Sequence, residues 1–487
     1  MAEKNPVYVD PFSWAQAYLP ADEYKALLAS QDQPLSISIR INALKADPKT
    51  AIAKWSALYG WKTEPVPFCP SGFWIRSFES PPSATIEHRL GYFYIQEAAS
   101  MLPPELFDFS GIEKPLVLDM AASPGGKTTH LTALTGDTGL VIANDGSRSR
   151  IPALQIVLGN WGAAGQAVTC LPGEAFGSLY PDTFDAVLLD APCSMQGLRS
   201  AESHASRTIT LSEIESLAAR QLRLLESALR AAKPGGQVMY STCTLSPQED
   251  ELVLAALMKR YPGQFCIEDV SERLPVPAPA LTKIPGEKLP GQVGYALRLW
   301  PHRLGTAGFF AASLTKLERL PETAGGNWRL PHSGKTYKPI SHKDSQRLAS
   351  FLKDHYGFSL DEILEKSTLE VVTYKEHYYL IPEKLKDTFT NLPFLSAGIP
   401  LGKPLKDKVL IAHEFVSRFG DRFSNGVLIL EDELMSSWAR GEDIRGYRGA
   451  GSSLGEIYAI RDRFGRNLGR GKLLADRLKN MLPTRLF

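Results

Sequence analysis

Residues 116–128 read LVLDMAASPGGKT, and this stretch decides how the chain folds. A short apolar strand signal, LVLD, leads into a turn that contains Gly125 and Gly126 and then into the start of a helix. Glycines let the backbone approach closely, and the free N–H groups at a helix start offer a site for a negatively charged or polar cofactor group. The order strand, turn, helix therefore predicts a cofactor-binding α/β unit.

The same turn nearly completes the phosphate-binding loop of nucleotide triphosphatases, because Gly126, Lys127 and Thr128 match the end of that motif. The motif requires a glycine where this chain has Ala121. On this stretch alone, a triphosphatase and a turn with only a structural role both remain open.

Strand and helix signals alternate from residue 114 onward. The apolar strand signals lie at residues 116–119, 140–144, 186–190 and 237–241. With helical stretches between them, they predict an α/β fold with a mostly parallel, doubly wound, Rossmann-like sheet. A helix over 211–232 ends at KPGG, and further strands over 295–300 and 309–313 would close the sheet near residue 318.

The pattern changes along the chain predict four regions. A helix over 23–30, an alternating strand over 36–42 and a helix that opens at Asp47 and Pro48 indicate a small α+β module. The sequence LPETAGGN at 320–327 is linker-like, and more β-like patterns follow it. The predicted regions are an N-terminal α+β module (1–105), the cofactor-binding domain (106–318), a connecting α/β module (328–390) and a β-rich domain (391–487).

The composition is that of an ordinary globular protein, with 487 residues, 44% hydrophobic and 22% charged. The first residues lack the apolar core of a signal peptide, and no stretch reaches the ~18 uninterrupted apolar residues that span a bilayer. The five cysteines never pair as C-x-x-C, and no H-E-x-x-H occurs. We therefore expect a cytoplasmic protein with free thiols and with neither a membrane nor a metal as partner.

Positive charge gathers at the C-terminal end, although the whole chain carries only +1. Residues 445–487 contain ten Lys or Arg and three Asp or Glu. Such a run is often only a solvated face. Here Tyr447, Tyr458 and Phe464 are interleaved with arginines, which favours RNA binding because cations bind phosphates and aromatic rings stack on bases.

Two cysteines follow predicted strands: Cys193 in LDAPCS and Cys243 in YSTCTL. A lone cysteine at a strand end is usually a small buried hydrophobe. In a doubly wound sheet, however, both loops open onto the edge that carries the glycine-rich turn, so two thiols would lie beside one cofactor. The SPQE sequence at 246–249 is typical of a capping box, and a helix beginning there would lower the pKa of the Cys243 thiol.

The second predicted strand ends at Asn144 and Asp145, and Arg150 follows. An acidic residue at this place can hold the ribose hydroxyls of a nucleoside cofactor. It could also cap a helix over 147–161, and the two roles are compatible.

These segments closely resemble the RNA (cytosine-5)-methyltransferases of the Nol/Nop/Sun family. The resemblance rests on the Ala-x-Pro-Gly-Gly-Lys turn, residues 144–145, the DAPCS and STCTL segments, the acidic residues 249–251, and residues 40–42, 91–97 and 305–310. The C-terminal segment, with Gly455 and residues 469–472 and 478–483, resembles a PUA-like RNA-binding domain. The resemblance thus spans nearly the entire chain and includes a bacterial branch of the family that acts on 16S ribosomal RNA.

The resemblance implies transfer of a methyl group from S-adenosylmethionine to carbon 5 of a cytosine in RNA, most directly 16S rRNA in the small ribosomal subunit. Cys243 would be the nucleophile that adds to carbon 6, and Cys193 would assist breakdown of the adduct. Asp190 would hydrogen-bond the polar edge of the ring, and Lys127 would lie close to the reaction centre. The implied cofactor-binding residues are Ala121, Ala122, Ser123, Pro124, Gly125, Gly126, Lys127, Asp145, Arg150, Pro172 and Asp190.

Three positions depart from the family pattern. Pro172 stands where an acidic residue usually contacts the adenine after the third strand, and Glu174 is the nearest possible substitute. Met195 interrupts the usual Ser-Gly-x-Gly sequence after Cys193, and Ser123 replaces a commoner alanine. Because both cysteines are retained, the sequence favours an active enzyme.

Other functions remain as alternatives. Pro172 and Met195 motivate a non-catalytic ribosome assembly factor that has kept the fold, and transfer RNA is a possible substrate. Amino-group methyltransferases are disfavoured because Cys193 stands where their motif has a second proline. A triphosphatase would not explain two cysteines at strand ends.

Overall fold

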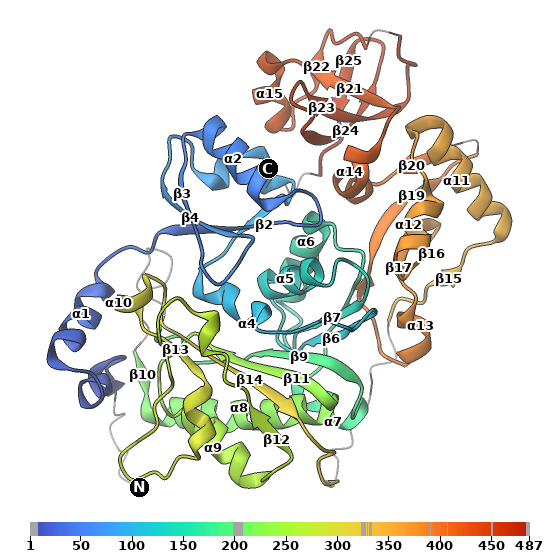
Figure 1. Cartoon of the computed structure of the whole chain (residues 1–487). Helices are drawn as coiled ribbons and strands as arrows, with labels where there is room; N and C mark the ends of the chain where they lie inside the picture. The colour runs from blue at the N-terminus through green and yellow to red at the C-terminus, as the bar shows by residue number, and fades with distance from the viewer. Residues whose placement is uncertain are drawn as a thin grey trace, which may run out of the picture.

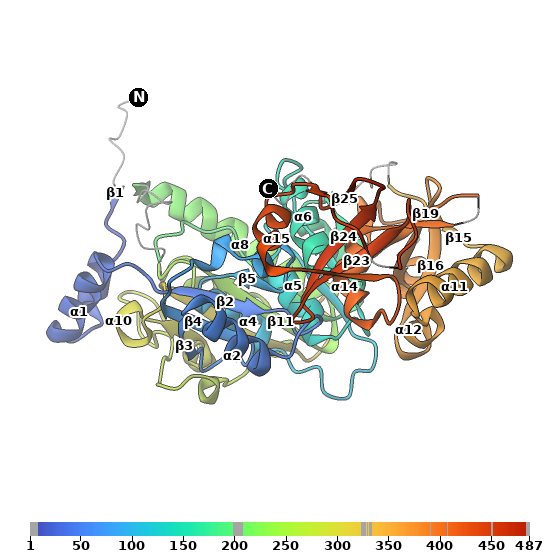
Figure 2. The same cartoon turned by 90° about the horizontal axis from the view of Figure 1, so that it is seen from above.

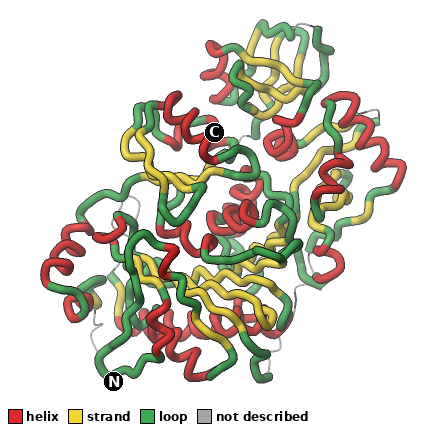
Figure 3. The backbone as a smooth tube through the Cα atoms, viewed as in Figure 1, coloured by secondary structure: helices red, strands yellow, loops and turns green. Residues whose placement is uncertain are grey.

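The computed structural model describes residues 8–197, 208–322, 328, 330, 334–389, 391–406, 408–449 and 451–483. A large central sheet with helices on both faces forms the middle of the molecule (Figure 1), and the strands of this sheet run side by side between the flanking helices (Figure 3). Seen from above, the molecule is elongated, with α1 (Ala21–Gln31) at one end and α11 (His342–Tyr356) at the other (Figure 2).

The central sheet has the strand order β12-β14-β11-β9-β6-β7-β8-β18, and β13 pairs with β14. Its strands are β6 (Leu116–Asp119), β7 (Leu140–Asn144), β8 (Gln166–Thr169), β9 (Phe184–Asp190), β11 (Ala232–Thr242), β12 (Phe265–Ile267), β13 (Leu297–Leu299), β14 (Phe309–Lys316) and β18 (Ser396–Ala397). The pairs formed by β11, β9, β6, β7 and β8 are parallel, whereas β14 runs antiparallel to β11. The predicted doubly wound sheet is confirmed, together with the four predicted strands at its centre.

Three strands of this sheet have no counterpart among the predicted ranges. β8 and β12 are short, and β18 reaches the sheet from the connecting segment after residue 390, where it pairs antiparallel with β8. The sheet therefore extends beyond residue 318, because a later part of the chain covers its β8 edge.

Alternate residues of the central strands point to opposite faces of the sheet and belong to two different hydrophobic cores. Leu116 and Leu118 of β6 belong to the core on the side of α8 and α9, whereas Val117 belongs to the core on the side of α4 and α5. The helices of this domain are α4 (Leu102–Glu105), α5 (Gly126–Leu134), α6 (Ile151–Trp161), α7 (Phe176–Leu179), α8 (Leu211–Ala231), α9 (Glu251–Arg260) and α10 (Pro301–Leu304). Helices on both faces are what a parallel sheet buried on both sides requires.

The N-terminal module contains a four-stranded sheet with the order β3-β4-β2-β5. Its elements are β2 (Ile37–Ile41), α2 (Pro48–Tyr59), β3 (Lys62–Pro65), β4 (Gly72–Ser77), α3 (Ile86–Arg89) and β5 (Phe93–Ile95), and β1 (Tyr8–Val9) pairs with β10 (Ile209–Thr210). Asp47 caps α2 by accepting a hydrogen bond from the backbone N–H of Thr50 at 2.9 Å, and Pro48 opens the helix, as predicted.

The last part of the chain forms two five-stranded sheets. The first, β15-β16-β17-β19-β20, is built from β15 (Lys338–Pro339), β16 (Leu369–Tyr374), β17 (His377–Pro382), β19 (Ile399–Pro404) and β20 (Val409–Ile411), with α11, α12 (Leu360–Lys366) and α13 (Lys384–Thr388). The second, β21-β23-β24-β25-β22, is built from β21 (Val427–Leu430), β22 (Ile444–Arg445), β23 (Ile457–Asp462), β24 (Asn467–Leu473) and β25 (Arg477–Asn480), with α14 (His413–Phe419) and α15 (Asp432–Ala439).

The predicted boundary between residues 390 and 391 is wrong, because β19 pairs with β17 and so continues the first of these sheets. We place the boundary after β20, near residue 412, and call the part beyond it the C-terminal domain. The PUA-like character of that domain stays a prediction. Within the described residues, no helix is long and apolar enough to cross a membrane.

Candidate active site

A cavity of about 380 Å³ opens at the carboxyl edge of the central sheet. It lies where β6, β9 and β11 end, as expected for the binding site of a doubly wound sheet. The residues that line it are Tyr94, Ile95, Gln96, Glu97, Ser100, Asp119, Ala121, Ala122, Ser123, Pro124, Gly126, Lys127, Asp190, Cys243 and Phe309. Most of the predicted turn residues, the predicted Lys127 and Asp190, and one predicted thiol therefore meet in one place, whereas the predicted Asp145 and Arg150 do not line the cavity.

The two predicted thiols are adjacent: Cys193 Sγ and Cys243 Sγ lie 3.3 Å apart. Only Cys243 lines the cavity, while Cys193 lies behind it. The hydrogen bond to Cys243 and burial raise the pKa of Cys193 well above its usual value. Cys193 therefore holds its proton and can donate it toward Cys243, which leaves Cys243 as the thiol positioned to attack a bound molecule.

Lys127 and Asp190 form an ion pair at 2.7 Å beside Cys243. Lys127 Nζ also donates to Ser100 Oγ at 2.8 Å, and Ser241 Oγ donates to Asp190 Oδ1 at 2.8 Å. Burial alone would lower the pKa of Lys127, but the carboxylate of Asp190 outweighs this effect and raises it. Lys127 is thus a fixed positive charge in the cavity that Cys243 also lines.

Asp119, at the end of β6, is a site residue that the sequence did not identify. It is 1% exposed, accepts a hydrogen bond from Thr128 Oγ1 at 2.6 Å, and its Oδ1 atom has no hydrogen-bond partner among the described residues. Burial raises its pKa to about 7, although the Thr128 hydrogen bond opposes the shift. An unpaired buried acceptor that lines a cavity indicates a missing donor, such as a ligand ammonium group.

Asp145 does not line the cavity but supports the turn that does. It accepts hydrogen bonds from the backbone N–H groups of Ser123 at 3.2 Å and Ser147 at 2.8 Å, and it lies 3.4 Å from Arg150. Arg150 also donates to the carbonyl oxygen of Ser123. The predicted helix start at residue 147 is wrong, since α6 begins at Ile151 with Arg150 at its N-cap, so Asp145 holds the loop before the helix.

Pro172 is exposed and follows the end of β8 near Gly146, outside the lining of the cavity. Glu174, the possible substitute for the missing acidic residue, is directed toward α8, where it pairs with Arg220 at 3.6 Å. Among the described residues, no acidic side chain of this loop lines the cavity.

The loop after Cys243 is held by buried charges. The predicted capping box at Ser246 is wrong: α9 begins at Glu251, and residues 247–250 form turns before it. The side chain of Glu249 instead accepts a hydrogen bond from the backbone N–H of Ser194 at 2.9 Å, which ties the two thiol-bearing loops together. The helix start that the sequence placed three residues after Cys243 therefore lies further along the chain, at Glu251.

Arg298 completes this support from β13. It is fully buried, lies 3.4 Å from Asp250, pairs with Glu251, and donates to the carbonyl oxygen of Leu245 at 2.6 Å. Removing one member of a buried ion cluster costs about 3–5 kcal/mol, because it leaves a charge without a partner. The acidic residues 249–251 therefore fix the position of the loop that carries Cys243.

Met195 and Gly197 shape the loop after Cys193. Met195 has φ +58°, a left-handed conformation that glycine adopts without strain, and its side chain is 47% exposed. Gly197 donates its N–H to the carbonyl oxygen of Cys243 at 3.0 Å and accepts from Gly308 N–H at 2.8 Å. A Cβ at position 197 would lie 2.3 Å from Gly308 O and 2.8 Å from Cys243 O.

We expect Gly197→Ala to lower the free energy of unfolding by about 1–3 kcal/mol and to slow the reaction by a factor on the order of 100, because the added methyl group must displace the backbone at Cys243. Denaturant unfolding and a turnover assay measure the two effects. Gly291→Ala is the matched control, since a Cβ there meets nothing within 4 Å. Equal activity of Gly197→Ala and the wild type would show that this contact does not position the thiol.

The N-terminal module forms one wall of the cavity. Arg40 is fully buried and donates to Gln96 Oε1 at 3.0 Å, to the carbonyl oxygen of Gly126 at 2.8 Å and to Thr129 Oγ1 at 2.7 Å. Glu97 accepts a hydrogen bond from the backbone N–H of Ala307 at 2.8 Å. These contacts explain why the family resemblance extends to residues 40–42, 91–97 and 305–310, although no role could be assigned to them from sequence.

A polar cluster of Cys69, Glu105 and His130 lies on the other side of α5. His130 Nε2 and Glu105 Oε1 are 2.7 Å apart. Burial lowers the pKa of His130 to about 4 and raises that of Cys69 to about 12, so both are neutral at pH 7. With the buried guanidinium of Arg40 nearby, we interpret the cluster as internal hydrogen bonding.

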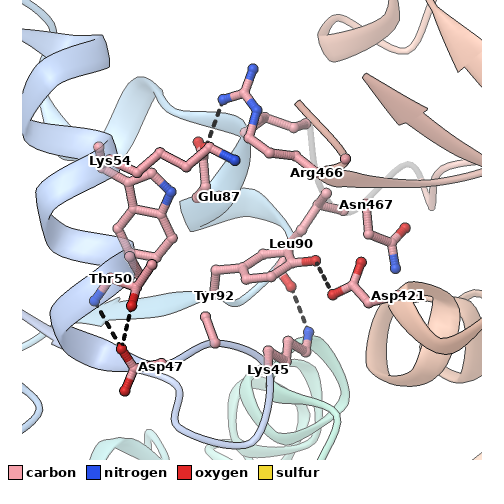
Figure 4. A pocket seen from close by; sticks show the side chains of 15 residues that line it. Lys45, Asp47, Thr50, Lys54, Glu87, Leu90, Tyr92, Asp421, Arg466 and Asn467 are labelled. Carbon is pink, nitrogen blue, oxygen red and sulfur yellow. Dashed lines mark hydrogen bonds and ion pairs between the residues drawn. The ribbon is translucent and has the colours of Figure 1, made fainter. Parts of the chain in front are cut away.

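A second cavity, of about 260 Å³, lies between the N-terminal module and the C-terminal domain. Figure 4 shows that cationic and acidic side chains face one another across it. Arg466 donates to Glu87 Oε1 at 2.7 Å, and Lys45 Nζ donates to the carbonyl oxygen of Leu90 at 2.7 Å and to Ser417 Oγ at 2.8 Å. We call this region the domain junction, because its contacts join elements far apart in the sequence.

Part of the basic C-terminal segment is used in contacts inside the protein. Arg466 lies at the domain junction, whereas Arg461 donates to the carbonyl oxygen of Phe423 at 2.8 Å, Arg470 donates to that of Ile411, and Arg477 pairs with Asp443 at 3.0 Å. The exposed basic side chains that remain include Arg445, Arg448 and Lys479, and Phe464 is 48% exposed. The predicted RNA-binding surface is therefore smaller than the charge count suggested.

The comparisons with known proteins agree with this architecture. The model of the family "16S rRNA methyltransferase RsmB/F" matches residues 110–315, and that of the N-terminal domain of 16S rRNA methyltransferase RsmF matches residues 12–98. "Ribosomal RNA small subunit methyltransferase F" of Aeromonas hydrophila is 35% identical over 96% of this chain and 94% of the relative. The protein of the same name from Shewanella oneidensis is 32% identical over 100% of this chain and 98% of the relative.

Solved structures resemble part of the chain. A methyltransferase homolog protein from Pyrococcus horikoshii has a TM-score of 0.55 and 31% identity, and covers 61% of this chain and 92% of its own. NSun6 from the same organism, solved with SFG, has a TM-score of 0.52 at 21% identity, covering 63% of this chain and 98% of its own, which shows the shared fold.

Proposed function

The chain belongs to the family of 16S rRNA methyltransferases RsmB/F, and we propose that it transfers a methyl group from S-adenosylmethionine to carbon 5 of a cytosine in 16S rRNA, with Cys243 as the nucleophile. The observation that carries the assignment of roles is the thiol pair, in which only Cys243 lines the cavity and Cys193 lies 3.3 Å behind it.

The reaction proceeds through addition to the ring. The Cys243 thiolate forms a bond to carbon 6 of the cytosine, and the electron pair of the carbon 5–carbon 6 double bond makes carbon 5 nucleophilic. S-adenosylmethionine supplies an electrophilic methyl group to carbon 5. The methyl donor would leave as S-adenosylhomocysteine. The proton on carbon 5 then passes to a water molecule, the double bond re-forms, and the bond from carbon 6 to sulfur breaks, which returns the thiolate. Cys193, with its firmly held proton, assists this last stage beside the leaving sulfur.

Asp190 and Lys127 orient the substrate and maintain the charge of the site. The Asp190 carboxylate is held by Lys127 and Ser241, so its direction is fixed before the cytosine enters. It hydrogen-bonds the polar edge of the ring, and the Lys127 ammonium keeps the carboxylate in place and supplies the positive charge of the cavity.

The residues around the turn fit S-adenosylmethionine. Asp119, with its unpaired buried oxygen, would accept the amino group of the methionine end. The turn residues 121–127 would lie along the cofactor, and Asp145 and Arg150 would support the ribose side, as in the predicted set. Pro172 would offer only an apolar surface near the adenine. The acidic contact that is usual there is absent from the described residues, so the cofactor must depend more on Asp119.

We expect Asp119→Asn to have opposite effects on stability and on binding. The pKa of Asp119 is raised from 3.8 to about 7, so its carboxylate destabilises the folded protein progressively as the pH rises through this range. At pH 8 the free energy of unfolding of the variant should therefore be about 1–3 kcal/mol higher than that of the wild type, whereas at pH 4 the two values should be similar. Denaturant unfolding at both values measures this difference.

The same variant should bind S-adenosylmethionine about 10–100-fold more weakly at pH 8, because an amide cannot supply the charge that an ammonium group requires. Wild-type affinity should fall below pH 7, where the carboxyl group takes up a proton. Calorimetric titration measures both. Unchanged affinity in the variant would remove Asp119 from the cofactor site.

RNA is the proposed partner of the whole molecule. A base stacked in folded RNA cannot reach Cys243 at the bottom of a cavity, so the target cytosine must be unpaired or flipped. The exposed Arg445, Arg448 and Lys479 of the C-terminal domain support phosphate binding there. We expect the reaction to take place in the cytoplasm, on the small ribosomal subunit or its RNA.

Incubation with radiolabelled S-adenosylmethionine tests the proposed function. Small ribosomal subunits, free 16S rRNA and transfer RNA are offered separately, and the labelled nucleoside is identified after digestion. Label in 5-methylcytidine of 16S rRNA or of the subunit is the expected result. Label found only in transfer RNA would show that transfer RNA is the substrate. RNA binding without methyl transfer would favour a non-catalytic assembly factor.

A further inference from the structure

A groove of about 370 Å³ lies next to the active-site cavity. Ser83, His88, Arg89, Gly91, Phe93, Tyr94, Val157, Asn160 and Trp161 line it. Tyr94 also lines the active-site cavity, so the two spaces adjoin at this side chain. We call this space the Tyr94 groove.

The charge of the Tyr94 groove suits a polyanion. No acidic side chain is among the described residues that line it, and Arg89, which also donates to the carbonyl oxygen of Ala439, supplies a positive charge. His88, whose pKa is lowered by burial, and Asn160 add neutral groups that hydrogen-bond phosphate or base edges. The domain junction of Figure 4 differs, since Asp47, Glu87 and Asp421 line it. Of these two neighbours of the N-terminal module, the Tyr94 groove is the one that a nucleic acid strand could enter without repulsion.

Tyr94 is positioned as a stacking surface at the boundary of the two spaces. Its ring packs over the first residue of α5: a Cβ at Gly126 would lie 3.0 Å from Tyr94 Cε1. The Tyr94 hydroxyl has no hydrogen-bond partner among the described residues, and the side chain is only partly buried. An aromatic ring held this way can stack on a base at little cost in side-chain entropy.

The groove also lies toward the C-terminal domain. Arg89 donates to the carbonyl oxygen of Ala439 at the end of α15, so the N-terminal module meets the C-terminal domain at this point. A strand that leaves the active-site cavity past Tyr94 would therefore reach the domain that carries the exposed basic residues.

We propose that the Tyr94 groove holds the nucleotide adjacent to the target cytosine, with its base stacked on Tyr94 and its phosphate near Arg89 and His88. This inference rests on the proposed function, since it takes RNA as the substrate. The groove makes the enzyme sensitive to the nucleotide beside the target, and Tyr94 keeps the two unstacked bases apart.

Steady-state kinetics with small ribosomal subunits from cells that lack this protein tests the groove. At saturating S-adenosylmethionine, we expect Tyr94→Ala to lower kcat/KM for the subunits roughly tenfold, from the loss of one stacked base. Because Tyr94 also lines the active-site cavity, calorimetric titration of S-adenosylmethionine measures any change in cofactor affinity separately. Tyr94→Phe, which keeps the ring, should recover a value within about threefold of the wild type. Phe78→Ala is the matched control, because Phe78 is an exposed phenylalanine of the same module outside the groove.

Ultraviolet crosslinking of the wild-type protein to the same subunits gives a readout that does not depend on folding of a variant. A nucleotide crosslinked to Phe93 or Tyr94 is the expected result in peptide mass spectrometry. Crosslinks only to other residues, together with a kcat/KM of Tyr94→Ala within about twofold of the control, would overturn the proposal that the Tyr94 groove binds a nucleotide. Absence of methyl transfer by the wild type would instead overturn the proposed function, whatever the crosslinks show.

Discussion

Cys243→Ala is expected to reduce methyl transfer by a factor on the order of 10³ or more, because it removes the atom that makes carbon 5 of the cytosine reactive. The binding of S-adenosylmethionine should change little, since the turn residues, Asp119 and Lys127 remain in place. Label incorporation into small ribosomal subunits and calorimetric titration of the cofactor measure the two quantities.

Cys266→Ala is the matched control for this variant. Cys266 is also a free cysteine at a sheet position, but it lies on β12 at the far edge of the central sheet and does not line the cavity. The control should keep wild-type activity. Transfer by Cys243→Ala at more than about a tenth of the wild-type rate would contradict the role of this thiol.

Cys193→Ala is expected to retain the first half of the reaction and to lose the second. Cys243 remains free to add to the cytosine, but the proton held 3.3 Å from its sulfur is gone, so breakdown of the adduct should slow. A covalent complex of protein and RNA should accumulate and resist denaturation in a gel. The double variant with Cys243→Ala should show no such complex.

An alternative outcome would reverse the two roles. If Cys243→Ala trapped RNA and Cys193→Ala did not, Cys193 would be the nucleophile. The geometry argues against this, because Cys193 does not line the cavity and its pKa is raised well above the usual value. Its loop is also held in place by the hydrogen bond from Ser194 to Glu249.

The central sheet could be predicted from sequence because its signals are local. β6 and β7 match the predicted strands residue for residue, since each is a short apolar run bounded by turn residues. β18 could not be predicted, because two residues of an edge strand carry no periodic signal and their partner, β8, is more than 200 residues away in sequence. The boundary near residue 412 was missed for the same reason, since pairing between β17 and β19 determines it.

The site could be predicted in part. The thiols, Asp190 and the turn belong to short motifs, and the shared edge of a parallel sheet brings them together. Asp119 was missed because an aspartate at a strand end looks like any strand terminus until its unpaired oxygen is seen. The role of Glu249 was misjudged because SPQE satisfies a local capping rule, whereas in the fold a tertiary hydrogen bond to Ser194 replaces the cap.

Peptide mass spectrometry of the RNA complex trapped with Cys193→Ala identifies the residue that is bonded to the RNA. A nucleotide mass attached to Cys243 and to no other cysteine is expected, and its cytosine should carry the methyl group. A stable complex linked through any other residue, or label in 5-methylcytidine formed by Cys243→Ala at the wild-type rate, would contradict the role of Cys243 as the nucleophile.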